Sequence, residues 1–576
     1  MKNRNCAVPM IVPAAGLPPL LLLYFIWRQA VNLPYMDQWD GFFLQILLPL
    51  REGCLNLGSL WHQHNEHRLF FPRLIMLALA LPSRWNVVWE QYASVCLQGI
   101  TFVFVAATAG RTFTPGRRRP LQLFIVLASI LLFSMVQHEN WAWGWQLQVY
   151  LNLLAAAMAF WASAGGPQRL RRLLLAASAC LLGTFSFANG LILWWVLFPW
   201  ILRGPKGPAR TARAIFWLIL SLGSAGAYFS GYRHPVHHPN LTLFLEDPAS
   251  FCMFFLAYLG APLGKPLGTG AAALLGLLGL LASFAALFRV LREGHRIPDP
   301  ARPWFASIAF VVLSALATAL GRMGFGPSHA LASRYTAFST FFWVGLAAVL
   351  FLNDHPYGVF TGQAGPLRKW VISLLFTGLI VLHALAYAQG LSAFTAHNAN
   401  LRDTLDLLRY DRVYGGGDRF GRIYPDLKIL GRAILRLRQQ GLGPFHKDIK
   451  KPRGLYAQWP PRLVKEGLFR PSRESLVPKE PPFDLILEQD GGYEVFLDVG
   501  TCTCPAIIRL LMDGELLGTG RCTGRRRAGS PRSSLLPIGR LTVARGRHRF
   551  EVMKNDPSCH VRGLVLIPAR AGGLKE

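Results

Sequence analysis

The chain has 576 residues, of which 52% are hydrophobic and only 16% are charged. Charge this sparse leaves too little polar surface for an ordinary soluble fold, so the composition predicts a membrane protein. The formal net charge of +30 comes from basic residues in short segments between apolar runs and in the last third of the chain. This distribution favours anionic lipid over nucleic acid as the partner.

Apolar runs before residue 391 predict about eleven membrane-spanning helices, since crossing about 30 Å of hydrocarbon takes roughly 20 residues. Short basic segments alternate with the runs, and such segments stay in the cytoplasm. This rule places the N-terminus in the cytoplasm and, after an odd number of crossings, the C-terminal domain outside. The first run also has the basic start of a signal peptide, although no small-residue cleavage site follows it. The runs lie at 10–28, 86–109, 121–136, 146–164, 173–188, 190–202, 214–231, 267–290, 303–320, 336–353 and 370–390.

Two carboxylates follow the first predicted span, in the sequence PYMDQWD. Asp37 and Asp40 begin an external loop that continues to about residue 73, which is long for a simple connection. A carboxylate at the membrane surface can take a proton from an acceptor hydroxyl or hold a divalent cation beside a phosphate, so both are candidate catalytic residues. Alternatively, either one caps a short surface helix over 41–53 by accepting backbone N–H bonds.

The same loop contains the polar sequence HQHNEHR. The HxHxxH spacing of His62, His64 and His67 is found in some zinc sites of soluble hydrolases. Here an apolar stretch follows immediately, which favours substrate hydrogen bonding or a structural polar network over zinc. Glu66 is a second candidate for a catalytic base, and Arg68 joins the histidines as a candidate for binding sugar hydroxyls or phosphate.

A further external loop, QHENWAWGWQ, interleaves three tryptophans with polar side chains. Tryptophan is common at membrane interfaces without any ligand. Indole faces beside hydrogen-bonding groups also suit a carbohydrate, because its C–H faces stack on aromatic rings. The candidate ligand-binding residues of this loop are His138, Glu139, Asn140, Trp143 and Gln146.

Basic residues in the later external loops are candidates for binding a phosphate. Arg322 ends one predicted span and Arg334 begins the next, on the side of the membrane where positive charge is usually scarce. A guanidinium fork matches phosphate oxygens, although an arginine at a span edge can also extend to the headgroups without a ligand. Arg334 is the strongest candidate. The others are Arg322, Tyr335, Lys265, His237 and His238.

Hydropathy falls after residue 390, and we expect amphipathic helices and linkers on the outer membrane face over 391–482. One of them, DLKILGRAILRLRQQG, is basic and amphipathic, which is typical of a helix that lies on a membrane or packs on a neighbouring domain. Over 483–576, short alternating stretches with DG and ND turns predict a small β-sandwich. Such a domain would bind carbohydrate, position the acceptor, or serve stability alone.

Four of the nine cysteines fall in this last region, at Cys502, Cys504, Cys522 and Cys559. Their spacing lacks the CxxC pairs of a zinc ribbon. We therefore expect disulfides, formed in an oxidising compartment.

The layout resembles the GT-C class of membrane glycosyltransferases, which includes protein O-mannosyltransferases, oligosaccharyltransferases and lipid A aminoarabinose transferases. In that class an acidic residue just after the first span is catalytic or binds metal, and Asp37 in PYMDQWD occupies that place. Segments near 41–50 and 69–82 match the surface helices of the class, and later loops supply cations for a lipid phosphate. Asp37 is followed by Gln38 where O-mannosyltransferases have an acidic pair, and the sequence has no oligosaccharyltransferase-type WWD.

Together these patterns predict a mainly α, polytopic membrane protein with a small C-terminal all-β domain, and the resemblance implies that residues 1–390 form a GT-C-like domain. It implies a glycosyltransferase in a bacterial inner membrane. The donor would be a polyprenyl-phosphate-linked sugar, the acceptor a hydroxyl of an envelope glycan, lipid or protein, and Mg²⁺ or Mn²⁺ the cation if one takes part.

Two alternatives remain open at this point. One is a transporter or flippase of a lipid-linked or polar substrate, against which stand the few ionisable residues in the predicted spans and the lack of a clear inverted repeat. The other is a polymerase or ligase of lipid-linked polysaccharide, which would use the same arginines with an oligosaccharide donor.

Overall fold

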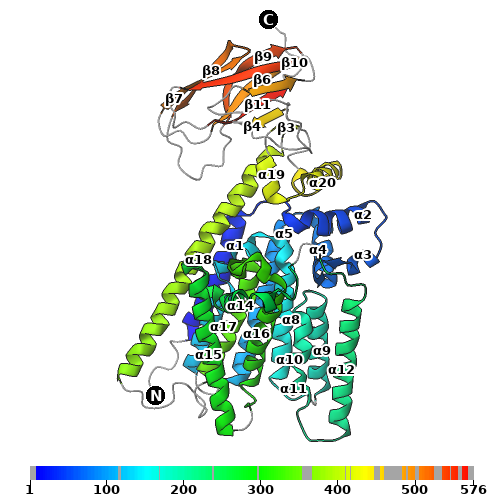
Figure 1. The fold of residues 1–576 in the computed structure, drawn as a ribbon, viewed down its shortest axis with the longest axis vertical. Helices are drawn as coiled ribbons and strands as arrows, with labels where there is room; N and C mark the ends of the chain where they lie inside the picture. Colours follow the sequence, from blue (N-terminus) through cyan, green and yellow to red (C-terminus); the bar gives the residue numbers. More distant parts are fainter. Residues whose placement is uncertain are drawn as a thin grey trace. The chain divides into compact units, whose positions relative to one another are not determined.

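The chain forms two compact units in the computed structural model (Figure 1). The first comprises Met1–Val31 with Gln45–Ala399 and is helical. The second combines Asn32–Leu44 with Asn400–Glu576 and contains the larger β-sheets. The structure describes residues 8–113, 118–167, 169–235, 239–294, 297–352, 366–408, 410, 412–414, 417–446, 455–458, 483–487, 491–499, 505–523, 535–544, 546–554 and 561–568.

Long apolar helices make up most of the first unit, and short helices with a small hairpin connect them. The long ones are α1 (Val8–Gln29), α5 (Val88–Thr112), α6 (Arg118–Leu132), α8 (Leu147–Ser163), α9 (Leu170–Thr184), α12 (Pro208–Phe229), α14 (Pro248–Gly264), α15 (Thr269–Gly294), α16 (Arg302–Arg322), α17 (Ser333–Phe351) and α18 (Pro366–Leu407). The shorter elements are α2 (Leu48–Arg51), α3 (Gly58–Trp61), β1 (Gln63–His64), β2 (His67–Arg68), α4 (Phe70–Ser83), η3 (Met135–Gln137), α7 (His138–Ala142), η4 (Gly144–Gln146), α10 (Gly190–Val196), α11 (Phe198–Ile201), α13 (Leu243–Glu246), η5 (Lys265–Leu267), η6 (Met323–Phe325) and η7 (Pro327–Leu331).

Eight helical segments among the described residues are long and apolar enough to cross a membrane, which indicates a membrane protein. Seven of them correspond to expected spans. The eighth, Pro248–Leu267, includes α14 and falls where the sequence analysis expected only a loop. That expectation was wrong because two prolines and several aromatic and small residues interrupt the run of aliphatic side chains. The remaining expected spans, at 10–28, 146–164, 173–188 and 190–202, coincide with α1, α8, α9 and α10–α11, which are not among the eight.

Glycines let α14 and α15 pack closely against each other. A Cβ added at Gly260 would lie 1.8 Å from the Ala272 carbonyl oxygen, and one at Gly276 would lie 1.9 Å from the Leu256 carbonyl oxygen. Only glycine permits backbones to approach this closely. The Gly- and Ala-rich pattern of 268–284 is therefore a helix-packing surface.

Helix α18 runs unbroken for 42 residues, through the boundary that the sequence analysis placed at residue 390. Polar residues such as Asn398 and Asn400 lower the hydropathy after that point, but neither proline nor a further glycine interrupts the helix before its end. Gly390 lies against η3, where an added Cβ would be 1.9 Å from the Met135 carbonyl oxygen. Close backbone packing thus fixes this part of α18 within the first unit.

The second unit contains two antiparallel sheets, apart from the parallel β3–β4 pair, and its core contains apolar residues from both sheets, as the predicted sandwich requires. One sheet has the order β5-β10-β7-β8 and the other β3-β4-β11-β6-β9. Asp513 and Gly514, both with positive φ, make the tight turn between β7 and β8. The strands are β3 (Arg412–Tyr414), β4 (Leu455–Gln458), β5 (Phe483–Leu487), β6 (Gly491–Val499), β7 (Pro505–Met512), β8 (Glu515–Thr523), β9 (Leu535–Val543), β10 (Gly546–Lys554) and β11 (Val561–Pro568).

Short helical segments accompany the sheets: η1 (Met36–Gln38), η2 (Trp39–Leu47, which continues into the first unit), α19 (Gly417–Ile423), α20 (Leu427–Gln439) and η8 (Gly443–Phe445). The apolar face of α20 is buried, so this helix packs on its neighbours, while Lys428, Arg432 and Arg436 form an exposed basic stripe. Cys522 lies on β8. The other cysteines of the expected disulfides, Cys502, Cys504 and Cys559, lie outside the described residues.

Candidate functional site

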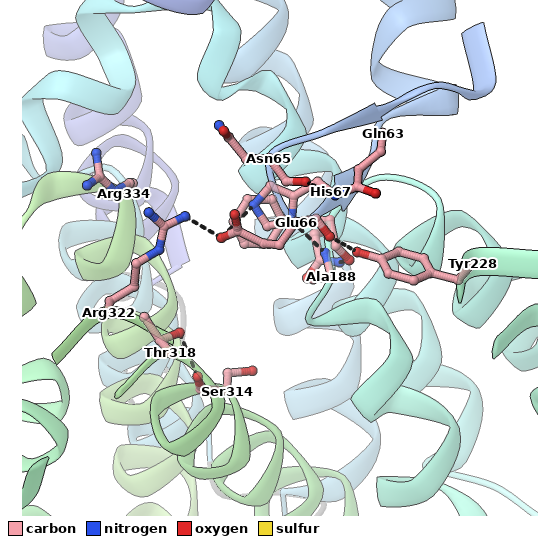
Figure 2. Close-up of polar contacts among 12 residues, drawn as sticks. Gln63, Asn65, Glu66, His67, Ala188, Tyr228, Ser314, Thr318, Arg322 and Arg334 are labelled. Atoms are coloured by element: carbon pink, nitrogen blue, oxygen red, sulfur yellow. Dashed lines mark hydrogen bonds and ion pairs between the residues drawn. The ribbon is translucent and has the colours of Figure 1, made fainter. Parts of the chain in front are cut away.

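The HQHNEHR sequence forms a tight β-hairpin in the first unit. Strands β1 and β2 pair in antiparallel fashion, with His64 opposite His67. The turn between them is made by Asn65 and Glu66, and Asn65 adopts a positive φ of 48°, which asparagine tolerates better than most residues. The turn places the Glu66 side chain at the tip of the hairpin (Figure 2).

Contacts with the end of α12 hold this hairpin in place. Arg68 is buried and donates to three backbone carbonyls, those of Trp61, Tyr228 and Ser230. The Tyr228 hydroxyl donates to the backbone carbonyl of Glu66 at 2.5 Å. The Gln63 amide exchanges two hydrogen bonds with the backbone of Arg233, at 2.6 and 3.0 Å. Arg68 therefore acts as a structural anchor, and we no longer assign it to phosphate binding.

His67 connects the hairpin to the segment that follows α9. Its Nδ1 accepts a hydrogen bond from the Ala188 backbone N–H at 3.2 Å, and its ring stacks on Phe187 with centroids 3.9 Å apart. Its Nε2 lies 3.4 Å from Glu66 Oε1. His64 packs edge-on against Trp145. The imidazoles of His64 and His67 therefore contact different neighbours.

Glu66 pairs with Arg322, which lies 256 residues away at the end of α16 (Figure 2). The Arg322 guanidinium donates to Glu66 Oε1 at 2.5 Å, and both side chains are largely buried. Burial alone would raise the pKa of this carboxyl, but His67 and Arg322 outweigh it and lower the pKa of Glu66 from 4.5 to about 2. A carboxylate with so low a pKa is a weak base, so the expected role of Glu66 as a general base loses its support.

Arg334 joins the same cluster from the start of α17. Its guanidinium donates to His329 Nε2 at 2.7 Å, and it lies 5.1 Å from the ring centre of Tyr335. Burial, together with the neighbouring Arg334 and Arg322, lowers the pKa of His329 from 6.5 to about 4, so this imidazole is neutral at physiological pH. The structure thus gathers two guanidiniums and one carboxylate from α16, α17 and the hairpin.

A second polar cluster forms around Ser333, the first residue of α17. The Asn140 amide donates to the Ser333 carbonyl at 2.8 Å, and the Ser333 hydroxyl lies 3.4 Å from His138 Nδ1. Lys265 is within electrostatic reach of both His138 and Glu139. Because Ser333 precedes Arg334 directly, His138 and Asn140 contact the residue next to Arg334.

The tryptophans of this loop are packed inside the protein. Trp141 and Trp145 are fully buried and Trp143 is 6% exposed. The Trp141 indole donates to the Ser134 carbonyl and stacks on Tyr150. Buried indoles cannot offer a face to a sugar in this conformation, so we withdraw carbohydrate stacking as their role. Gln146 is buried as well.

The remaining candidates of the first unit fall into three groups. Tyr335 is buried, and its ring stacks on Tyr258 with centroids 5.5 Å apart. His62 is exposed; its backbone N–H donates to the Ser59 carbonyl at 3.3 Å and its backbone carbonyl accepts from Arg73 at 2.6 Å. His237 and His238 lie outside the described residues.

Asp37 and Asp40 belong to the second unit, in η1 and η2. Both lie close to Tyr424, whose hydroxyl hydrogen-bonds to the Asp40 carboxylate. Burial and these two carboxylates raise the pKa of Tyr424. Asp37 lies in the first turn of η1 and Asp40 in the first turn of η2. The two aspartates stay candidates for the base on the sequence evidence alone.

Metal binding finds little support in the side-chain arrangement. Within the described ranges, no three His, Cys, Asp or Glu side chains come together in a group that could hold an ion. The hairpin histidines face different neighbours, which argues against the HxHxxH zinc site.

Sequence reasoning missed several residues of the cluster. Tyr228 lies near the end of α12, and Tyr232 follows this helix. Burial and the charge of Glu66 raise the pKa of Tyr232, so its hydroxyl is within electrostatic reach of that carboxylate. His329 lies in the loop GRMGFGPSHALASRY that contains both arginines, so its position was the available signal.

No family model, no curated protein and no solved structure matches this chain.

Proposed function

We propose that this protein is a membrane glycosyltransferase that moves a sugar from a polyprenyl-phosphate donor to a hydroxyl acceptor. The observation that carries the proposal is the clustering of Arg322 and Arg334 at adjoining ends of two membrane-length helices, α16 and α17. Helix ends of this kind lie at the depth of lipid headgroups, where the phosphate of a lipid-linked donor also lies. Guanidinium groups match phosphate oxygens in geometry and charge.

The reaction would use these charges mainly on the leaving group. The acceptor oxygen attacks the anomeric carbon, the bond from that carbon to the phosphate oxygen breaks, and the lipid phosphate leaves with the bonding electrons. Arg322 and Arg334 would stabilise the negative charge that grows on the phosphate. The acceptor proton would pass to a carboxylate, for which Asp37 is the first candidate and Asp40 the second.

Release of polyprenyl phosphate tests this proposal. Wild-type protein in lipid nanodiscs is supplied with a panel of lipid-linked sugars and with acceptors from the cell envelope. Arg334→Ala and Arg322→Ala should each lower turnover by about 10² to 10³, as expected when a group that stabilises transition-state charge is removed. Asp37→Asn should lower turnover without changing donor binding, because its role concerns the acceptor.

The matched control is Arg292→Ala, which removes an exposed arginine from the end of α15. This variant should retain wild-type turnover. Full activity in both Arg322→Ala and Arg334→Ala would contradict the proposed phosphate site. Activity that is lost in these two variants but retained in Asp37→Asn would support the phosphate site and make Asp40 the candidate base.

One observation favours a transporter instead. His383 is buried within α18, and ionisable residues inside membrane helices often mark a transport path. A transporter would move the substrate across the nanodisc or liposome membrane without releasing polyprenyl phosphate, so the same assay separates the two functions.

A further inference from the structure

The Glu66 side chain is not needed to hold the hairpin in which it lies. The anchors of the hairpin are the Arg68 guanidinium, the Gln63 amide and the bond from the Tyr228 hydroxyl to the backbone carbonyl of Glu66. The carboxylate itself extends from the tip to Arg322. The fold thus presents one fixed negative charge, on a rigid support, to a guanidinium of the proposed phosphate site.

We infer that Glu66 is a specificity-determining residue, which makes the donor site select sugars linked through one phosphate over sugars linked through a diphosphate. This inference rests on the proposed function and adds the class of donor. Glu66 contacts Arg322 and lies close to His67 and Tyr232, so it is part of the site in which the phosphate would bind.

Charge explains the selection. A sugar phosphodiester carries one negative charge, and a sugar diphosphodiester carries two. The Glu66 carboxylate is ionised at neutral pH, so it repels each ligand charge and also competes with phosphate oxygens for Arg322. The repulsion is larger for the donor with two charges, and because Glu66 is largely buried, solvent screens this repulsion less than bulk water would.

The test compares binding of two probes that differ by a single phosphate, farnesyl phosphoglucose and farnesyl diphosphoglucose. Dissociation constants are measured for the full-length protein in nanodiscs at neutral pH. Wild type should prefer the phosphodiester. Glu66→Gln keeps the size and hydrogen-bonding capacity of the side chain but removes its charge, and should shift the ratio of the two constants toward the diphosphate by about tenfold or more.

Two further variants serve as controls. Glu66→Asp retains the charge, and Glu246→Gln removes the charge of an exposed carboxylate on α13; both should keep the wild-type ratio. Thermal unfolding of each variant is measured first, and Glu66→Ala, which also removes the charge, replaces Glu66→Gln if that variant does not fold.

An unchanged ratio in Glu66→Gln, with both probes binding to wild type, would overturn the inference and leave the proposed function standing. A failure of wild type to bind either probe, with the same result in Arg322→Gln, would overturn the proposed donor site itself. Because binding is measured directly, neither result depends on finding the acceptor.

Discussion

Arginines of the first unit have quite different roles in this protein. Arg68 donates to three backbone carbonyls and Arg73, fully buried, donates to the carbonyls of Ser59, Leu60 and His62. Arg322 and Arg334 instead contact a carboxylate and an imidazole. A guanidinium that bonds to backbone carbonyls supports the fold, whereas one that contacts ionisable side chains is available for exchange with a ligand.

The low pKa of His329 predicts a dependence of stability on pH. The histidine titrates near 6.5 in the unfolded chain and near 4 in the folded protein, so between these values the unfolded state binds more protons. The free energy of unfolding should therefore fall as the pH drops from about 6.5 to about 4. Below about pH 4 the histidine should cause no further loss. Replacing His329 by Asn should remove on the order of 1 kcal/mol of this loss, after allowance for solvent screening.

Thermal unfolding of wild type and His329→Asn at about pH 7 and about pH 5 measures the effect. The exposed His62 supplies the control, since His62→Asn should lose stability in parallel with wild type. Parallel loss in His329→Asn as well would mean that the imidazole does not stay neutral in the folded protein.

The sequence identified Glu66, Arg322 and Arg334 as candidates but could not bring them together. Each was selected for its residue type and its place beside an apolar run, and this reasoning is local. The Glu66–Arg322 contact joins residues 256 positions apart, so it depends on how the helices pack. The burial of the tryptophans could not be predicted either, because a tryptophan at a membrane interface and a tryptophan in a protein core look alike in a sequence.

At the scale of helices, periodic patterns were reliable and irregular ones were not. The β-sandwich and the helix α20 follow clear patterns and were predicted. Helix α14 was missed because prolines and aromatic residues disguise it, and the length of α18 was missed because its second half is polar. Neither hydropathy nor residue type shows that neighbouring elements support a helix, as η3 supports α18 at Gly390.

The crossing of α14 and α15 gives a prediction with a control on the same helix. Gly276→Ala places a methyl group 1.9 Å from the Leu256 carbonyl oxygen, so the helices must separate, and a loss of about 1–3 kcal/mol is expected. Gly270→Ala meets nothing within 4 Å, and should be neutral or stabilise the helix by up to about 1 kcal/mol. Unfolding midpoints in detergent compare the two variants. Equal unfolding midpoints for the two variants would show that α14 and α15 do not pack this closely at Gly276.

The two compact units do not follow the order of the chain. The second unit takes Asn32–Leu44 from the start of the chain and joins it to everything after Ala399. Trp39, Phe42 and Phe43 in that first segment are buried. Asp40 of the same segment hydrogen-bonds to Tyr424, which a C-terminal truncation would remove.

Truncation after Leu407 should therefore expose the segment 32–44. Chymotrypsin should cleave it at least about tenfold faster than in the full chain, because cleavage follows the population of the open state. Full-length Tyr424→Ala, which removes the contact with Asp40, should give an intermediate rate. The cleavage sites are identified by mass spectrometry. Equal rates in all three proteins would contradict the assignment of this segment to the second unit.

This division has a consequence for biosynthesis. Roughly 350 residues separate the two parts of the second unit, and a ribosome adds about 5 to 20 residues per second, so the early segment waits about 20 to 70 s for its partner. During that interval its aromatic side chains need temporary cover from lipid or from a chaperone. A segment made near the beginning of translation is thus among the last to be buried.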